Sequence, residues 1–293
     1  MDLQPYQRER IVTPDDDFLD LDWLKQKSLK LIILSHGLEG NAQRAYIKGM
    51  ARAGYKNGYD ILAWNYRGCS NEMNKTLRFY HSGATDDLAT VVEHAHALNQ
   101  YKEIFLVGFS LGGNLTLKYL GEDRPRPASL KKSVTFSVPL DLLASCEKIS
   151  QPSNWIYSQR FLKSLSKKIL LKSKLVKGLD SGRLKKIKTL REFDEYFTGP
   201  IHGFKDALDY YNQCSAIRFV QNIQLPTLLV NAVNDPFLSP ECYPHKLLKN
   251  HAYVVFESPE HGGHVGFAQF SKTGLYWSEE QTLNFFHTNN RNL

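Results

Sequence analysis

Six short apolar segments recur along the chain, and longer segments with helix-compatible patterns separate most of them. This alternation is typical of βαβ units, in which parallel strands form one sheet and helices cover its faces. The six segments are Leu31 to Ser35, Asp60 to Tyr66, Ile104 to Phe109, Ser133 to Val138, Thr227 to Ala232 and Ala252 to Glu257. Because they are almost continuously apolar, we expect both faces of each strand to be buried. The chain is therefore predicted to be an α/β protein with a mostly parallel central sheet flanked by helices.

The remaining patterned segments predict the helices and one hairpin. The N-terminal stretches Glu9 to Thr13 and Phe18 to Trp23 alternate around a Pro-Asp-Asp-Asp turn, so we expect an antiparallel hairpin at one sheet edge. Helical patterns cover Ala42 to Tyr55, Thr85 to Leu98, Leu111 to Leu120, Pro240 to Lys249 and Ser278 to His287.

The alternation is interrupted between the fourth and fifth apolar segments. Residues 139–223 show no strand pattern and are rich in Lys and Leu. We predict that they form a helical cap (the cap segment), inserted into an α/β core made of residues 1–138 and 224–293. Within it, Phe161, Leu165 and Ile169 recur every four residues with lysines on the other faces, which indicates an amphipathic helix. We expect the cap segment to cover the site and shape an apolar acyl pocket.

The net charge of +7 is concentrated in one stretch of the chain. Twelve basic residues and one acid, Asp180, lie between Arg160 and Arg191, and the rest of the chain has a small excess of acidic residues. A protein that binds nucleic acid would carry a broader basic face, so no nucleic-acid partner is expected. We expect the lysines to be a solvated surface; the alternative is weak peripheral docking to anionic membrane lipid.

The cysteines and the apolar runs bear on the compartment. The four cysteines are far apart in the sequence, without the paired spacing of a zinc site or the density of a disulfide-rich domain. The first 30 residues lack the apolar core of a signal peptide, and no window holds 18 consecutive apolar residues. These observations predict a cytoplasmic protein with reduced thiols.

The motif Gly108-Phe109-Ser110-Leu111-Gly112 fits G-x-S-x-G and lies between a predicted strand and a predicted helix. In that context the two glycines allow the strand and the helix to approach closely, and the serine adopts a strained backbone that exposes its hydroxyl. We therefore predict that Ser110 is a nucleophile.

A serine hydroxyl needs a base that is oriented by a carboxylate, and folds of this kind supply them in the chain order serine, acid, histidine. Asp235 follows the fifth apolar segment and His264 follows the sixth, so both lie in loops at the carboxyl ends of strands. The flanking glycines favour His264 over His261. Asp141 is the alternative acid, although we expect it to cap the helix that follows it.

Ester cleavage also needs amide donors for the developing oxyanion. The predicted pair is the Leu111 amide, next to the nucleophile, and the Leu38 amide in the loop Ser35-His36-Gly37-Leu38-Glu39-Gly40-Asn41. We expect His36 to brace this loop rather than act as a base. No phosphate-binding glycine motif and no metal-ligand spacing such as H-E-x-x-H occurs, so no cofactor or metal is expected.

Taken together, these motifs resemble the α/β-hydrolases, and more narrowly their YheT-like branch, which includes the plant embryogenesis-associated hydrolases and several animal lipases. The resemblance implies esterase or lipase-like activity with Ser110 as nucleophile, Asp235 as acid and His264 as base. Departures are the absence of a glycine in residues 71–74 and a short N-terminus without the membrane anchor of the animal members. The matching stretches are His36 to Gly40, Asn65 to Ser70, Tyr80 to Gly83, Gly108 to Asn114, Phe193-Asp194, Gly203-Phe204, Tyr210-Tyr211, Asn234 to Pro236 and Gly262 to Phe267.

The motifs together predict a serine hydrolase that cleaves carboxylic esters through an acyl-enzyme. Its partner would be a small-molecule or lipid-like ester, and no oligomeric state is indicated. Two alternatives share the same scaffold: a non-catalytic binding protein, and an enzyme that hydrolyses amides or thioesters or transfers acyl groups from the same site.

Overall fold

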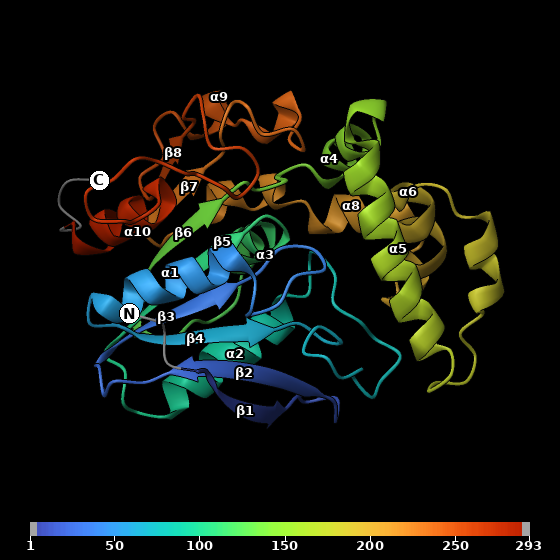
Figure 1. The fold of residues 1–293 in the computed structure, drawn as a ribbon, viewed down its shortest axis with the longest axis horizontal. Helices are drawn as coiled ribbons and strands as arrows, with labels where there is room; N and C mark the ends of the chain where they lie inside the picture. The colour runs from blue at the N-terminus through green and yellow to red at the C-terminus, as the bar shows by residue number, and fades with distance from the viewer. Residues whose placement is uncertain (1–4, 289–293) are drawn as a thin grey trace.

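One eight-stranded sheet runs through the computed structural model, which describes residues 5–288. The strand order is β1-β2-β4-β3-β5-β6-β7-β8 (Figure 1). Strands β1 and β2 form an antiparallel hairpin at one edge, β2 pairs antiparallel with β4, and all other neighbours are parallel. The strands are β1 (Gln7–Val12), β2 (Phe18–Leu24), β3 (Lys30–Ser35), β4 (Asp60–Asn65), β5 (Glu103–Phe109), β6 (Leu130–Phe136), β7 (Thr227–Val230) and β8 (Val254–Glu257). The predicted mostly parallel α/β sheet with an N-terminal edge hairpin is confirmed.

Helices cover both faces of the sheet, and alternate residues of each strand point to opposite faces. On β3, Ile32 and Leu34 join an apolar cluster with α1 (Ala45–Lys56) and α10 (Trp277–His287). Their neighbours Leu31 and Ile33 belong to a second cluster with α2 (Thr85–Ala97) and α3 (Leu111–Gly121). The core is therefore double-sided, as expected for apolar parallel strands.

One predicted helix is wrong. Residues 240–249 form a 3₁₀ turn, η6 (Pro240–Cys242), and the four-residue helix α9 (His245–Leu248). Pro244 separates the two, because a proline has no amide hydrogen to donate and disfavours the helical conformation in the residue before it.

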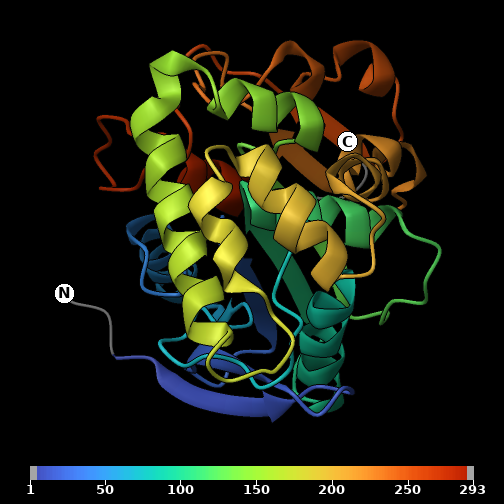
Figure 2. The same cartoon turned by 90° about the vertical axis from the view of Figure 1, so that its right-hand side faces the viewer.

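All the helices of the cap segment lie between β6 and β7, the fourth and fifth parallel strands. Figure 1 shows α4, α5, α6 and α8 at one end of the sheet, and Figure 2 shows the long α5 beside the shorter helices. They share an apolar cluster of their own, which includes Leu162, Phe193 and Tyr211. The elements are α4 (Leu142–Ile149), η1 (Pro152–Asn154), α5 (Trp155–Lys172), η2 (Ser181–Lys186), α6 (Leu190–Phe193), the short π-helix η3 (Asp194–Thr198), α7 (Gly199–Ile201), α8 (Ala207–Cys214), η4 (Ala216–Arg218) and η5 (Val220–Asn222).

The lysines of α5 do not all face solvent. Lys168 and Lys172 lie on the inner face, with Lys172 fully buried, so the expectation that lysines occupy only the other faces of this helix is wrong for these two. The Lys172 ammonium donates to the carbonyl oxygens of Asn74 and Thr76 at 2.7 and 2.6 Å and to Asn74 Oδ1 at 2.7 Å. These bonds fasten α5 to the loop after β4.

The loop after β4 forms without the glycine that the YheT-like branch led us to expect in residues 71–74. Asn71 has a φ of 73°, in the left-handed region where glycine is usually found. Asparagine tolerates this conformation better than most other residues, so the turn forms without a glycine. Among residues 5–288, no helix combines the length and apolar character needed to cross a membrane.

Candidate active site

Ser110 occupies a sharp turn between β5 and α3. Its φ and ψ angles are 56° and −120°, a strained conformation for any residue but glycine. The turn brings α3 directly onto the backbone of β3, and this is possible because Gly112 has no side chain. A Cβ added at Gly112 would lie 2.4 Å from the carbonyl oxygen of Ser35. This is the strand-turn-helix elbow that the motif predicted, and it holds the Ser110 side chain at the start of the helix.

Ser110, His264 and Asp235 meet at the carboxyl end of the sheet. His264 Nε2 lies 2.8 Å from Ser110 Oγ, and His264 Nδ1 lies 2.9 Å from Asp235 Oδ2. The side chain of Asp235 is fully buried, whereas that of His264 is 18% exposed. With the Nδ1 proton held by the carboxylate, Nε2 is free to accept the serine proton.

Short contacts between two loops hold this arrangement. Asn234 Oδ1 accepts hydrogen bonds from the amides of Gly262 and Gly263 at 3.0 and 2.9 Å, which ties the histidine loop to the acid loop. The Phe237 ring packs against the His264 ring with centroids 4.4 Å apart. The imidazole is therefore fixed both by its carboxylate and by ring packing.

The two alternative residues lie elsewhere. His261 is exposed, and within residues 5–288 no hydrogen bond joins it to Ser110 or Asp235. Asp141 is the N-cap of α4, where its side chain accepts a hydrogen bond from the Ala144 amide at 3.0 Å. Its geometry is that of a helix cap.

The loop after β3 lies beside Ser110. The carbonyl oxygen of Gly37 accepts hydrogen bonds from His36 Nδ1 at 2.8 Å and from the Gly40 amide at 3.0 Å. Burial lowers the pKa of His36 to about 3, so its ring is neutral and serves as a brace. Among the described residues, the amides of Leu38 and Leu111 donate no hydrogen bond to protein groups, and both residues line the pocket at Ser110.

A pocket of about 860 Å³, including its open mouth, extends from Ser110 and His264 beneath the cap segment. Much of its wall is apolar, and cap residues such as Leu142, Phe161 and Leu190 line it. A volume of this size suits a small organic or lipid-like ligand.

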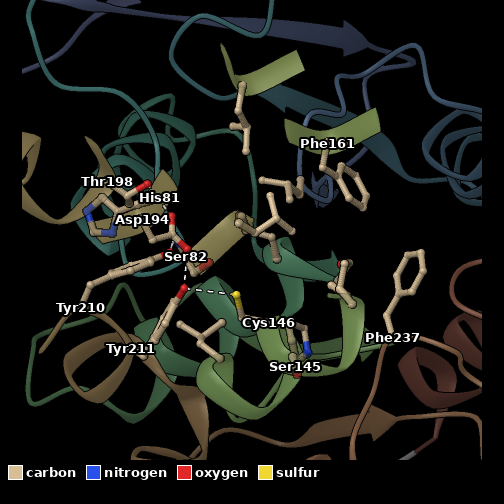
Figure 3. Close-up of a pocket in the computed structure, with 18 of the residues that line it drawn as sticks. His81, Ser82, Ser145, Cys146, Phe161, Asp194, Thr198, Tyr210, Tyr211 and Phe237 are labelled. Atoms are coloured by element: carbon tan, nitrogen blue, oxygen red, sulfur yellow. Dashed lines mark hydrogen bonds between the residues drawn. The ribbon is translucent and has the colours of Figure 1, made fainter. Parts of the chain in front are cut away.

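The pocket also has a polar region. Figure 3 shows His81, Asp194, Thr198 and Tyr211 on one side, away from Phe161 and Phe237. Asp194 accepts hydrogen bonds from the Tyr211 hydroxyl at 2.7 Å and from Thr198 Oγ1 at 2.5 Å. Burial raises the pKa of Asp194 to about 6 despite these bonds.

No sequence motif predicts a role for Asp194, Glu39 or Lys168. Asp194 and Glu39 lie in stretches that match the YheT-like branch, and Glu39 also lies in the loop predicted to carry the Leu38 amide. A signal for Lys168 was present, because it lies seven residues after Phe161 and so on the same helix face. Its partner Glu39, on a distant loop, could not be read from that spacing.

Residues 30–268 match the family model described as the alpha/beta hydrolase fold. The chain belongs to the α/β-hydrolases. This α/β-hydrolase is 34% identical over 270 residues to the Escherichia coli protein named "Putative esterase YheT", a match that covers 88% of this chain and 78% of that protein. It is 32% identical to the phospholipase ABHD3 of Bos taurus, over 91% of this chain and 67% of the relative. The predicted membership of the YheT-like branch is confirmed.

Solved structures agree with the fold of this α/β-hydrolase. The esterase Pf2001 of Pyrococcus furiosus superposes with a TM-score of 0.65 at 18% identity, over 96% of this chain and 89% of that one. At this identity the likeness supports the fold alone. Within residues 5–288, no three His, Cys, Asp or Glu side chains are grouped as a metal ion would require.

Proposed function

We propose that this α/β-hydrolase cleaves carboxylic esters, with Ser110 as nucleophile, His264 as general base and acid, and Asp235 as the orienting carboxylate. The observation that carries the proposal is the hydrogen-bonded chain from Ser110 through His264 to the buried Asp235, open to a largely apolar pocket. The names of relatives support it, since they include an esterase, a phospholipase and a monoacylglycerol lipase from Saccharomyces cerevisiae.

The proposed reaction has two halves. In the first, His264 Nε2 takes the Ser110 proton as Oγ attacks the ester carbonyl, and the amides of Leu38 and Leu111 stabilise the tetrahedral oxyanion. His264 then gives the proton to the departing alcohol, which leaves an acyl-enzyme on Ser110. In the second half, His264 activates a water molecule, and the acid is released.

The pocket favours esters with an apolar part. In this proposal the cap segment, residues 139–223, is a lid on the α/β core, and its side chains Leu142, Phe161 and Leu190 contact the acyl chain. We further propose that the enzyme acts in the reducing cytoplasm, because all four cysteines are free.

The test is turnover of p-nitrophenyl esters with acyl chains from two to sixteen carbons, together with labelling by a fluorophosphonate probe. We expect the protein to turn over esters and Ser110 to be labelled, because only an activated serine reacts readily with the probe. Ser110→Ala should lower turnover by about 10⁴-fold or more and abolish labelling while the melting temperature is unchanged. Retained turnover in this variant would refute the assignment, and an unlabelled, inactive protein would favour the non-catalytic binding alternative.

A second proposal concerns the outer face of α5, which we propose docks to anionic membranes. Trp155, Ile156 and Tyr157 are exposed at its start, and Tyr157 packs on Phe237 near the catalytic histidine. Exposed cations lie further along the same helix: Arg160, Lys163 and Lys167. Aromatic side chains beside cations suit the surface of an anionic bilayer.

The test of this docking is co-sedimentation with vesicles of phosphatidylcholine alone or with phosphatidylserine. Binding should require the anionic lipid, weaken with salt and fall in a Trp155→Ala/Ile156→Ala variant. Equal sedimentation with both vesicle types would count against membrane docking.

A further inference from the structure

A largely buried contact joins the cap helix α5 to the loop after β3. Lys168 Nζ lies 2.8 Å from Glu39 Oε1, and the two side chains are 16% and 6% exposed. Ser164, one turn earlier on α5, donates to the other oxygen of the same carboxylate. From the core side, the Tyr80 hydroxyl donates to Glu39 Oε1 at 2.6 Å and accepts from the Glu39 amide at 2.9 Å. Glu39 is therefore held between the cap segment and the core.

Lys168 stays charged in this position. Burial alone would lower the pKa of its ammonium, but the Cys69 sulfur, 2.9 Å away, and the Glu39 carboxylate raise that pKa above its ordinary value. Burial raises the pKa of the Cys69 thiol, so at neutral pH its uncharged sulfur accepts the Lys168 hydrogen bond and Glu39 is the counter-charge of the ammonium. Removing one member of a buried ion pair leaves the other without its counter-charge, so the loop is sensitive to either residue.

The contact acts on Glu39, the residue that follows Leu38, and Leu38 lines the pocket at Ser110. Glu39 has a φ of 53°, a conformation that a non-glycine residue keeps only when its surroundings hold it. In a trans peptide the Gly37 carbonyl and the Leu38 amide point in opposite directions, so the two hydrogen bonds to that carbonyl fix one side of the peptide. The contacts of Glu39 fix the backbone on the other side of Leu38.

We propose that Lys168 is a positioning residue of the active site: through Glu39, it holds the Leu38 amide where the oxyanion forms. This inference rests on the function proposed above and adds to it a dependence on the cap segment. The loop after β3 (residues 36–41, the oxyanion loop) keeps its conformation only when α5 packs on it, so the helix that covers the pocket also aligns the Leu38 amide.

The test compares Lys168→Met with Lys172→Met as a matched control. Both variants remove a buried ammonium from the inner face of α5, but Lys172 binds the 74–76 loop and not the oxyanion loop. For Lys168→Met we expect kcat to fall about 10- to 100-fold with KM unchanged within about twofold. The reason is that a misplaced oxyanion donor stabilises the transition state less well, whereas the binding of the ester in its ground state does not depend on that donor. Lys172→Met should lower the melting temperature and leave kcat within about threefold.

A transition-state analogue gives a readout that a merely structural role would not move. A trifluoromethyl ketone adds to Ser110 and places an oxyanion in the same position, so its Ki should rise in Lys168→Met by the factor by which kcat/KM falls. In Lys172→Met the Ki should not change. Ser164→Ala removes one hydrogen bond to Glu39 but keeps the ion pair, so it should lower kcat about 3- to 10-fold. This variant tests the same positioning role if Lys168→Met does not fold.

A double variant completes the design. Because Lys168 and Glu39 act as one unit, the effects of substituting them should not add. The double variant Glu39→Gln/Lys168→Met should therefore be as active as the less active of the two single variants. An increase in KM at constant kcat, or equal losses in Lys168→Met and Lys172→Met, would overturn the positioning role. Failure of the proposed function would show differently, as absence of ester turnover in the unsubstituted protein.

Discussion

Replacing Asp235 with asparagine exchanges one carboxylate oxygen for an NH₂ group and should move the imidazole proton of His264 from Nδ1 to Nε2. Asp235 Oδ1 accepts a hydrogen bond from the Phe237 amide at 2.9 Å and also lies 3.1 Å from His264 Nδ1, whereas Oδ2 makes the shorter contact with Nδ1, at 2.9 Å. In Asp235→Asn the amide oxygen keeps the Phe237 bond, so the new NH₂ group takes the position of Oδ2, the closer of the two to Nδ1. An NH₂ group donates to Nδ1, and the imidazole proton must then move to Nε2.

The expected loss of kcat follows from this change of the His264 tautomer. With Nε2 protonated, His264 donates to Ser110 Oγ and has no lone pair to take the serine proton, although no heavy atom has moved. A wrong tautomer of this kind lowers kcat by about 10⁴-fold, or about 5.5 kcal/mol in the activation free energy. Stability should change little, because both the carboxylate and the amide fill the same buried space.

The assay is steady-state hydrolysis of a p-nitrophenyl ester, with melting temperatures measured alongside. Asp141→Asn is the matched control: asparagine is as good an N-cap as aspartate, so both the activity and the stability of this variant should stay close to those of the unsubstituted protein. If Asp235→Asn keeps more than about a tenth of the activity, or if Asp141→Asn loses as much, the assignment of the acid is wrong.

Two further predictions concern stability. Gly112→Ala should lower the free energy of unfolding, measured in urea, by about 1 to 3 kcal/mol, although alanine favours helices. The reason is that the new Cβ would lie 2.4 and 2.6 Å from the carbonyl oxygens of Ser35 and His36. An unchanged unfolding transition would contradict this close packing. Burial raises the pKa of Asp194 from 3.8 to about 6, so the folded state binds that proton more tightly than the unfolded chain and loses stability as pH rises from about 4 to about 6. Relative to Asp194→Asn, the unsubstituted protein should therefore lose up to about 3 kcal/mol of unfolding free energy between pH 4 and pH 7, and parallel pH profiles would refute this.

Local patterns predicted the frame of the site well. The apolar segments predicted the strands, and G-x-S-x-G predicted the elbow at Ser110, because both depend on backbone conformation and on burial over a few residues. Since parallel strands end at the same edge of a sheet, the loops carrying Asp235 and His264 could also be expected near Ser110. The helix predicted over residues 240–249 does not form, because the conformational effect of Pro244 outweighs the apolar pattern of its neighbours.

What the sequence by itself determined is the order of strands and helices, the family and the edge of the sheet where reactive side chains gather. Only the tertiary structure showed that Lys168 pairs with Glu39 and that Lys172 binds the backbone of Asn74 and Thr76. The physical reason is that periodicity and turn chemistry act between near neighbours in the chain. The partner of a buried charge is chosen by which segments pack against each other, and that is decided by the whole fold.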